Sequence, residues 1–182
     1  MVIKMIKKTL IVGLVGIALF TFAPAFAANN VELQQLFEAD QNMRRNPEIT
    51  WDEIDELDKR HRIHVMSMLA QGMIKTGLDY FHAAVIFQHG ESVADIRLAH
   101  SFASISASLG YERATWLQAA SWDRLLMYFE QPQWYGTQFV MNDEGDWQLY
   151  EVDRNVVTDE QRAEWRVPSL AESEANIEKR NQ

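Results

Sequence analysis

Cysteine is absent from the 182 residues. A disulfide framework, a thiolate metal site and a lipid-anchoring cysteine are therefore excluded, and the fold must be stable through packing alone. Basic residues are in the minority, with 17 Lys and Arg against 26 Asp and Glu and a net charge of −9. An acidic chain is a poor partner for nucleic acid and for anionic lipid surfaces, so we expect neither.

A long apolar run is present at the N-terminus, over residues 10–20, but it is short for a membrane span. Lysines precede this run and an A-x-A sequence at residues 25–27 follows it, which is the order of a secretory signal peptide. We therefore predict a signal peptide over residues 1–27, membrane contact through this segment before cleavage, and a periplasmic or secreted product. The alternative is an uncleaved membrane anchor.

Beyond residue 30, apolar residues recur at helical spacing, and turns that contain glycine or proline separate the helical segments. Thr50 with Glu53, and Ser92 with Asp95, have the spacing of capping boxes at helix starts. After Pro132 the apolar residues alternate, which is typical of a β-hairpin. The predicted elements are helices over residues 31–44, 50–77, 79–89, 93–109, 112–130 and 158–165, and a hairpin over about residues 137–152.

These elements predict a mainly α fold. It is either a compact helical bundle or a short, helical-repeat-like superhelix, with one C-terminal β-hairpin. We expect a single domain over residues 28–170, followed by a charged tail over residues 171–182 that frays.

The most apolar helical segment runs from Trp116 to Phe129, with apolar residues on nearly every side, which is typical of a buried helix. Its middle nevertheless contains Asp123 and Arg124, which need partners because unpaired buried charges are costly. They form either a structural ion pair or part of a polar site. The next segment, residues 132–138, either binds a ligand or holds the hairpin on the helices.

The chain has five histidines, of which His82 and His89 lie two turns apart on one helix face. Their spacing does not match the HExxH pattern of zinc enzymes, and thiolate ligands are absent. We therefore expect no bound metal and no cofactor. The histidines then have structural or acid–base roles.

Several short motifs resemble a bacterial family of secreted domains of unknown function, with Q-H, D-R and Q-x-Y-G-T-Q signatures. The resemblance covers roughly residues 33–170 and departs from the family pattern at residues 72–78, where a Gly-Trp-Pro-like turn is expected. It brings no established activity, but it implies one constellation of polar side chains. The residues that carry it are Asp40, Arg44, Asp79, His82, Gln88, His89, Asp123, Arg124, Gln133, Tyr135 and Gln138.

Three interpretations of this constellation follow. The leading one is an exported helical domain that binds a ligand, an envelope component or a protein through a polar His/Asp/Arg/Gln cluster. The alternative is a small hydrolase or lyase in which His89 or His82 is the general base and Arg124 holds an anion. The third is a hydrogen-bonded core that serves folding alone.

We predict that His89, Asp123, Arg124 and Gln138 meet at one site, where Asp123 accepts hydrogen bonds from His89 or Arg124 and orients the base. The catalytic candidates are His89, Asp123 and Arg124. The ligand-binding candidates are His82, Gln88, Gln133, Tyr135 and Gln138.

Overall fold

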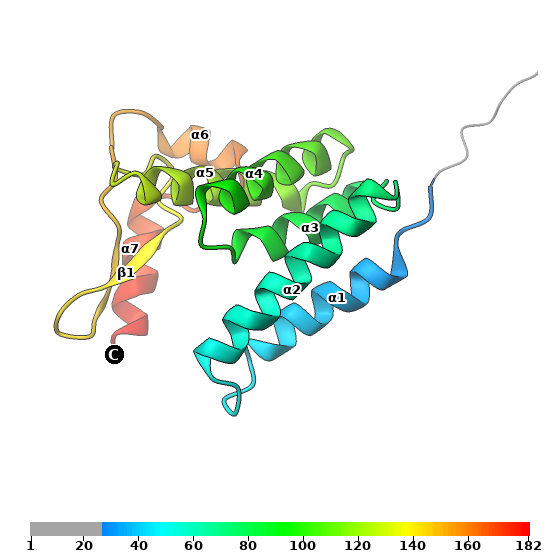
Figure 1. Cartoon of the computed structure of the whole chain (residues 1–182). Coiled ribbons are helices and arrows are strands. Elements are labelled where there is room, and N and C mark those ends of the chain that lie inside the picture. The colour runs from blue at the N-terminus through cyan, green and yellow to red at the C-terminus, as the bar shows by residue number, and fades with distance from the viewer. Residues whose placement is uncertain (1–26) are drawn as a thin grey trace, which may run out of the picture.

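The computed structural model describes residues 27–182, so the predicted signal peptide, apart from Ala27, lies outside the described residues. Within this range the chain is mainly helical, with one hairpin near its C-terminus, as predicted (Figure 1). None of the described helices is both long and apolar enough to cross a bilayer. The elements are α1 (Val31–Met43), α2 (Trp51–Ala70), α3 (Gly77–Gln88), α4 (Val93–Ser108), α5 (Arg113–Tyr128), β1 (Phe139–Met141), β2 (Trp147–Leu149), α6 (Asp159–Glu164) and α7 (Leu170–Arg180).

The core lies where α3 packs against its neighbours. Helices α3, α4 and α5 pack side by side in chain order, and α1 and α2 cover another side of α3. Small side chains on α4 allow this close approach: Ala99 and Ala103 are fully buried beside Phe87 and Phe102, whose rings meet edge to face. The hairpin, α6 and α7 form a separate arm beside α5, shown in yellow to red in Figure 1.

Hydrogen bonds from capping side chains set the helix starts. The two capping boxes predicted at Thr50 and Ser92 are present. A third, between Thr76 and Asp79, begins α3 at Gly77, two residues before the predicted start. The prediction that Gly77 ends the preceding helix is wrong, because α2 stops at Ala70 and Gly72 then takes a φ of 68°.

Helix α5 is buried along one face rather than on all sides. Its buried face carries Ala119, Ala120 and Asp123, whereas Trp116 and Tyr128 are 42% and 50% exposed. The expectation of an all-round buried helix is therefore wrong at both ends of the segment. The aromatic residues at these ends contribute surface, not core.

The predicted C-terminal tail is part of the domain. Residues Leu170–Arg180 form α7, which packs against β2. Asn181 holds this contact, because its side chain accepts a bond from the Trp147 amide and donates one to the Trp147 carbonyl, both at 2.9 Å. A domain boundary at residue 170 is therefore wrong. The acidic and basic residues of this segment lie on the polar face of an amphipathic helix.

Candidate functional site

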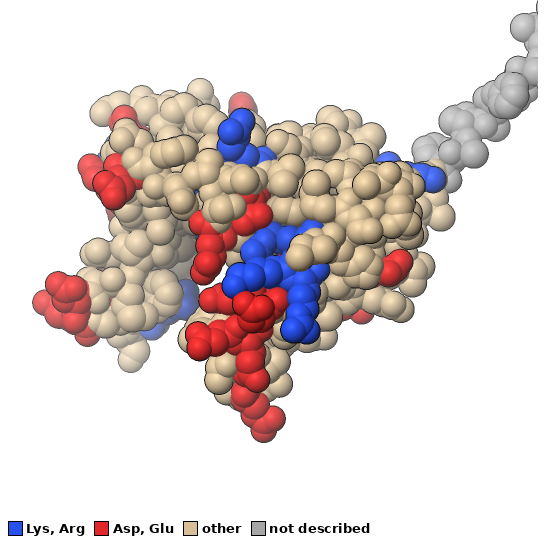
Figure 2. Space-filling view, viewed as in Figure 1, with Lys and Arg blue, Asp and Glu red and all other residues tan. Residues whose placement is uncertain are grey.

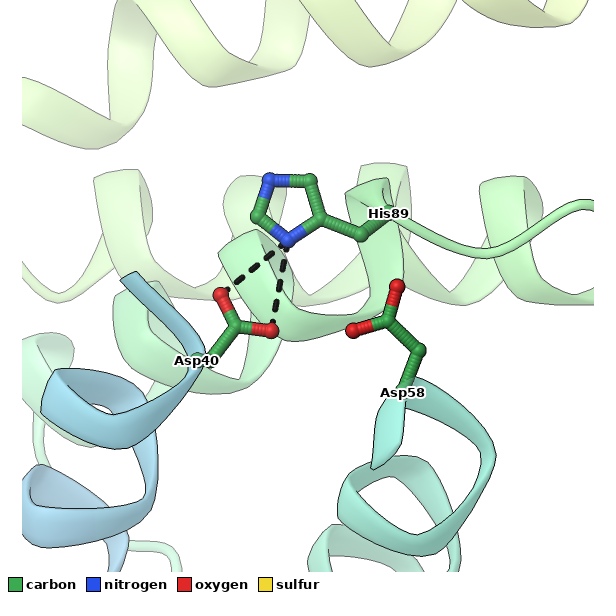
Figure 3. Close-up of side chains that lie close together, drawn as sticks. All are labelled: Asp40, Asp58 and His89. Carbon is green, nitrogen blue, oxygen red and sulfur yellow. Dashed lines mark hydrogen bonds and ion pairs between the residues drawn. The ribbon is translucent and has the colours of Figure 1, made fainter. Parts of the chain in front are cut away.

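A buried carboxylate, that of Asp40 near the end of α1, organises the polar centre of the molecule. It accepts hydrogen bonds from Gln41 at 2.8 Å and from Arg44 at 3.1 Å, and lies 3.1 Å from Nδ1 of His89 at the end of α3. Arg44 also reaches Asp58 of α2 at 2.5 Å. We call Asp40, Arg44, Asp58, His61 and His89 the Asp40 cluster; it joins three helices (Figure 3).

The surroundings of Asp40 stabilise its charged form. Burial by itself would raise the pKa of this carboxyl group, but nearby His61 and His89 and the positive charge of Arg44 outweigh burial and hold the pKa well below its usual range. His61 acts from a distance, because its Nδ1 lies 3.8 Å from Asp40 Oδ1 and does not form a hydrogen bond. Asp40 is therefore an anion throughout the neutral and mildly acidic range.

His89 presents one free ring nitrogen. An ionised carboxylate can only accept hydrogen bonds, so His89 donates to Asp40 through Nδ1. Its Nε2 points away from Asp40 and Asp58 in Figure 3, and has no hydrogen-bond partner among residues 27–182. The side chain is 24% exposed, so a ligand or substrate can reach this nitrogen from solvent.

Arg124 bonds the residue after His89 and has no carboxylate partner among residues 27–182. It is partly buried on α5, and its hydrogen bond within the described chain is a long one, 3.3 Å, to the carbonyl of Gly90. Burial lowers the pKa of the Arg124 guanidinium; Glu91 opposes this effect and Arg44 adds to it. A partly desolvated arginine with free donors is a recurrent feature of anion sites.

Two glutamines connect α3 and the segment after α5 to the same point. The side-chain amides of Gln88 and Gln138 donate to the carbonyl of Ala120, at 3.4 and 3.0 Å. Gln88 precedes His89, and Ala120 lies one helical turn before Arg124. The two glutamines therefore meet on α5, and Gln138 is at the same time held in the turn by the Gln133 side chain. Figure 2 shows Lys and Arg side chains gathered over α2, with acidic side chains on two sides of them.

Buried polar atoms without a partner are concentrated here. Of six such side-chain atoms in the described part of the chain, four belong to Asp58, His61, Arg62 and Gln88. Buried polar groups in native proteins nearly always have a partner, which is water, an ion or a ligand where the protein supplies none. The region around the Asp40 cluster is therefore the place where the structure most needs further polar contacts.

Asp40, Asp58 and His89 also have the separation of metal ligands, since one donor atom of each lies within 4.8 Å of the others. Sequence spacing does not show this triad, because its members come from three helices. Arg44, however, contacts both carboxylates and supplies the positive charge that a cation would bring.

We therefore still expect the purified protein to carry no stoichiometric zinc, because the Arg44 guanidinium would have to leave both carboxylates for a metal to enter. Elemental analysis after gel filtration tests this. Roughly one zinc per chain, whose removal by a chelator lowers the melting temperature, would contradict it.

Asp123 has a different role from the predicted one. Its carboxylate is fully buried and accepts bonds from the amides of Trp134, Tyr135 and Thr137 at 2.9, 3.0 and 3.1 Å, and from the Thr137 hydroxyl at 2.8 Å. Within residues 27–182, neither His89 nor Arg124 donates to it, so the prediction of that contact is wrong. The carboxylate that orients His89 is Asp40, on a helix far away in sequence.

The segment after α5 holds the arm on the helices. The buried Gln133 side chain bonds the backbone of Gln138 and Tyr150, so both ends of its amide are used within the protein. Arg162, which the sequence analysis missed, is also buried and donates to the carbonyls of Trp134 and Tyr135. Of the two interpretations of this segment, the contacts favour attachment of the hairpin over ligand binding by Gln133 and Tyr135.

The remaining candidates lie away from the Asp40 cluster. Asp79 accepts bonds from the amides of Asn30, Lys75 and Thr76 and is structural. His82 is buried and stacks on Phe37 with ring centroids 4.3 Å apart, and burial lowers its pKa. The constellation implied by the family resemblance therefore divides into three. Asp40, Arg44 and His89 belong to the Asp40 cluster, and Gln88 and Arg124 lie next to its His89 end. Asp123, Gln133, Tyr135 and Gln138 build the turn after α5, and Asp79 and His82 lie elsewhere.

Comparisons with protein-family models, curated proteins and solved structures found no match.

Proposed function

We propose that this chain is an exported helical domain that binds a small anionic ligand between Arg124 and His89. The observation that carries the proposal is a partly buried arginine, with no carboxylate partner among residues 27–182, that bonds the carbonyl of Gly90 next to a histidine whose Nε2 is free. An arginine out of full contact with water is costly unless an anion compensates it. A carboxylate or phosphate oxygen that accepts from Arg124 would provide that compensation, and a protonated oxygen of the same ligand, such as that of hydrogen phosphate, would donate to Nε2 of His89.

The unpartnered atoms nearby support a polar ligand. Asp58 Oδ1 and Gln88 Oε1 are acceptors without donors, whereas Arg62 Nη1 is a donor without an acceptor. A ligand shell that brings ordered water, or a ligand with both donors and acceptors, would satisfy these groups together.

A second candidate function rests on the Asp40–His89 contact. A carboxylate at Nδ1 fixes the tautomer that leaves the Nε2 lone pair free to take a proton, which is the arrangement of a general base. In a hydrolase or lyase of this kind, Asp40 orients the base in place of Asp123, and Arg124 stabilises negative charge that develops on the substrate.

The test is a titration of the histidine ring nitrogens by NMR, with inorganic phosphate and with acetate as probes. We expect saturable shifts of the His89 Nε2 signal, and binding weakened about tenfold, or about 1.4 kcal/mol, in Arg124→Gln. Arg45→Gln is the matched control, because Arg45 is an exposed arginine next to the cluster. A linear, unsaturable response to both anions, or equal losses in the two variants, would refute anion binding.

The acid–base candidate needs its own measurement. Turnover of an activated ester or phosphoester that is lost in His89→Gln and reduced in Asp40→Asn, while anion binding survives in Asp40→Asn, would favour catalysis. Binding without any turnover across such substrates would favour the binding domain.

Export has a separate test. N-terminal sequencing of the mature protein from periplasm or medium should begin at Ala28, and an intact N-terminus recovered from the cytoplasm would contradict export.

A further inference from the structure

We infer that a cavity lined by α5, the hairpin and α7, separate from the Asp40 cluster, binds a small aromatic carboxylate. The cavity has a volume of about 240 Å³. This is larger than the roughly 150 Å³ that suffices for benzene, and smaller than most drug-sized pockets. It therefore suits a single substituted ring. None of its lining residues belongs to the Asp40 cluster.

The walls of this cavity are aromatic and aliphatic. Trp116 of α5, Phe139 of β1 and Trp147 of β2 line it together with Val167 and Ile177. Three aromatic rings around one space favour a flat guest, because offset and edge-to-face ring contacts add to the free energy of apolar burial. Trp116 and Phe139 remain 42% and 39% exposed, so a guest that covers them would remove apolar surface from water.

The cavity is formed before any guest enters. Asn181 fixes the backbone of Trp147 by two hydrogen bonds, and the Arg180 guanidinium lies 4.1 Å from the centre of its ring. Gly136, with a φ of 82°, brings the chain so close to Leu170 that a Cβ would lie 2.7 Å from its Cδ2. Both ends of α7, which forms the wall opposite α5, are therefore fixed in the free protein. Binding of a guest then costs little free energy for ordering this helix.

Charge and hydrogen bonding define the substituent on the ring. Arg180 is the charged residue of the lining, which contains no Asp or Glu although acidic residues outnumber basic ones in this chain. The Arg180 guanidinium lies over the Trp147 ring and donates no side-chain hydrogen bond within the described residues, so its N–H donors are available to a carboxylate. Ser173 is 5% exposed, lines the cavity, and forms no side-chain hydrogen bond within the described residues, so its hydroxyl is available to the same guest.

Ligand-observed NMR and tryptophan fluorescence with four probes test this inference: benzoate, benzyl alcohol, cyclohexanecarboxylate and acetate. Fluorescence of Trp116 and Trp147 reports binding in this cavity, whereas the His89 ring signals report the anion site. We expect a saturable fluorescence change with benzoate, at least tenfold weaker binding of benzyl alcohol and of cyclohexanecarboxylate by the same signal, and no fluorescence change with acetate. A fluorescence change with acetate alone, or no saturation with benzoate, would overturn the inference. Arg124→Gln should leave benzoate binding unchanged, so this result is independent of the anion site near His89.

Three variants locate the guest. Ser173→Met fills the cavity. Trp116→Ala removes a wall that is already exposed, so this variant folds even if Ser173→Met does not. Both substitutions should abolish benzoate binding. Arg180→Gln should remove the preference for benzoate over benzyl alcohol, whereas Lys179→Gln, an equal charge change outside the lining, should not. Binding that survives the first two variants refutes the site. A dimer that dissociates in Ser173→Met without benzoate would also refute it, because a second copy would then occupy the cavity.

Discussion

Asp123→Ala is expected to lower the free energy of unfolding by at least about 3 kcal/mol, the largest stability loss of any single substitution considered for this chain. Its carboxylate is fully buried and receives four donors from the segment that begins the arm. Each donor left buried without an acceptor costs about 1–3 kcal/mol. Urea denaturation followed by circular dichroism measures the change.

Two further variants sharpen this experiment. Asp123→Asn keeps the shape of the side chain and one carbonyl acceptor but places an NH₂ group against backbone donors. Its free energy of unfolding should therefore fall by less than that of Asp123→Ala and by more than that of a surface variant. Asp143→Asn, in the exposed hairpin turn, is the matched control and should change stability by less than about 0.5 kcal/mol. A loss in Asp123→Ala no greater than in this control would show that the buried bonds do not hold the arm.

Asp40→Asn is expected to lower the free energy of unfolding by about 3 kcal/mol at pH 7, the lower end of the range for breaking a buried ion pair. The lower end applies because Arg44 keeps its contact with Asp58 in the variant. The variant offers His89 at most one neutral amide oxygen in place of the carboxylate that accepts from Nδ1. Denaturation at several pH values, compared with wild type, provides both the size and the origin of this loss.

The pH dependence has a definite sign. The pKa of Asp40 in the folded protein lies below its ordinary value of 3.8, so its ionisation stabilises the fold fully above that value. As pH falls below about 3.8 towards the folded-state pKa, wild type loses this contribution and Asp40→Asn does not. The difference between the two proteins should therefore shrink below pH 4. A difference that stays constant down to pH 2 would contradict the assignment. Glu48→Gln, an exposed change nearby in sequence, serves as control.

The helices and the hairpin were predictable because they depend on local patterns. Apolar spacing and the Thr50 and Ser92 capping boxes are contained in short stretches of sequence, and the structure has both. The errors concern elements whose surroundings decide their role. The segment after residue 170 was predicted to be a charged tail because its local sequence does not show that it packs against the apolar side of β2. Helix α5 was predicted to be fully buried, whereas its ends lie at the surface.

The candidate site was predictable in its residue types but not in its pairing. His89 and Arg124 were identified from positions where simple packing does not require them, yet the partner of His89 is 49 residues earlier in the chain. The sequence does contain a signal for Asp58, which lies at helical spacing between Ile54 and His61, on the buried stripe of α2. An acidic residue on such a stripe needs a buried partner, which is Arg44.

The arrangement around Asp123 has a consequence for how the molecule opens. The amides of Trp134, Tyr135 and Thr137 are bonded to a side chain of α5, so their exchange with solvent deuterium reports on the junction between the arm and the helical layers. If the arm detaches while α3, α4 and α5 stay packed, these protons exchange faster than the core amides of α3. If one carboxylate makes the two parts a single cooperative unit, they exchange at the rate of global unfolding.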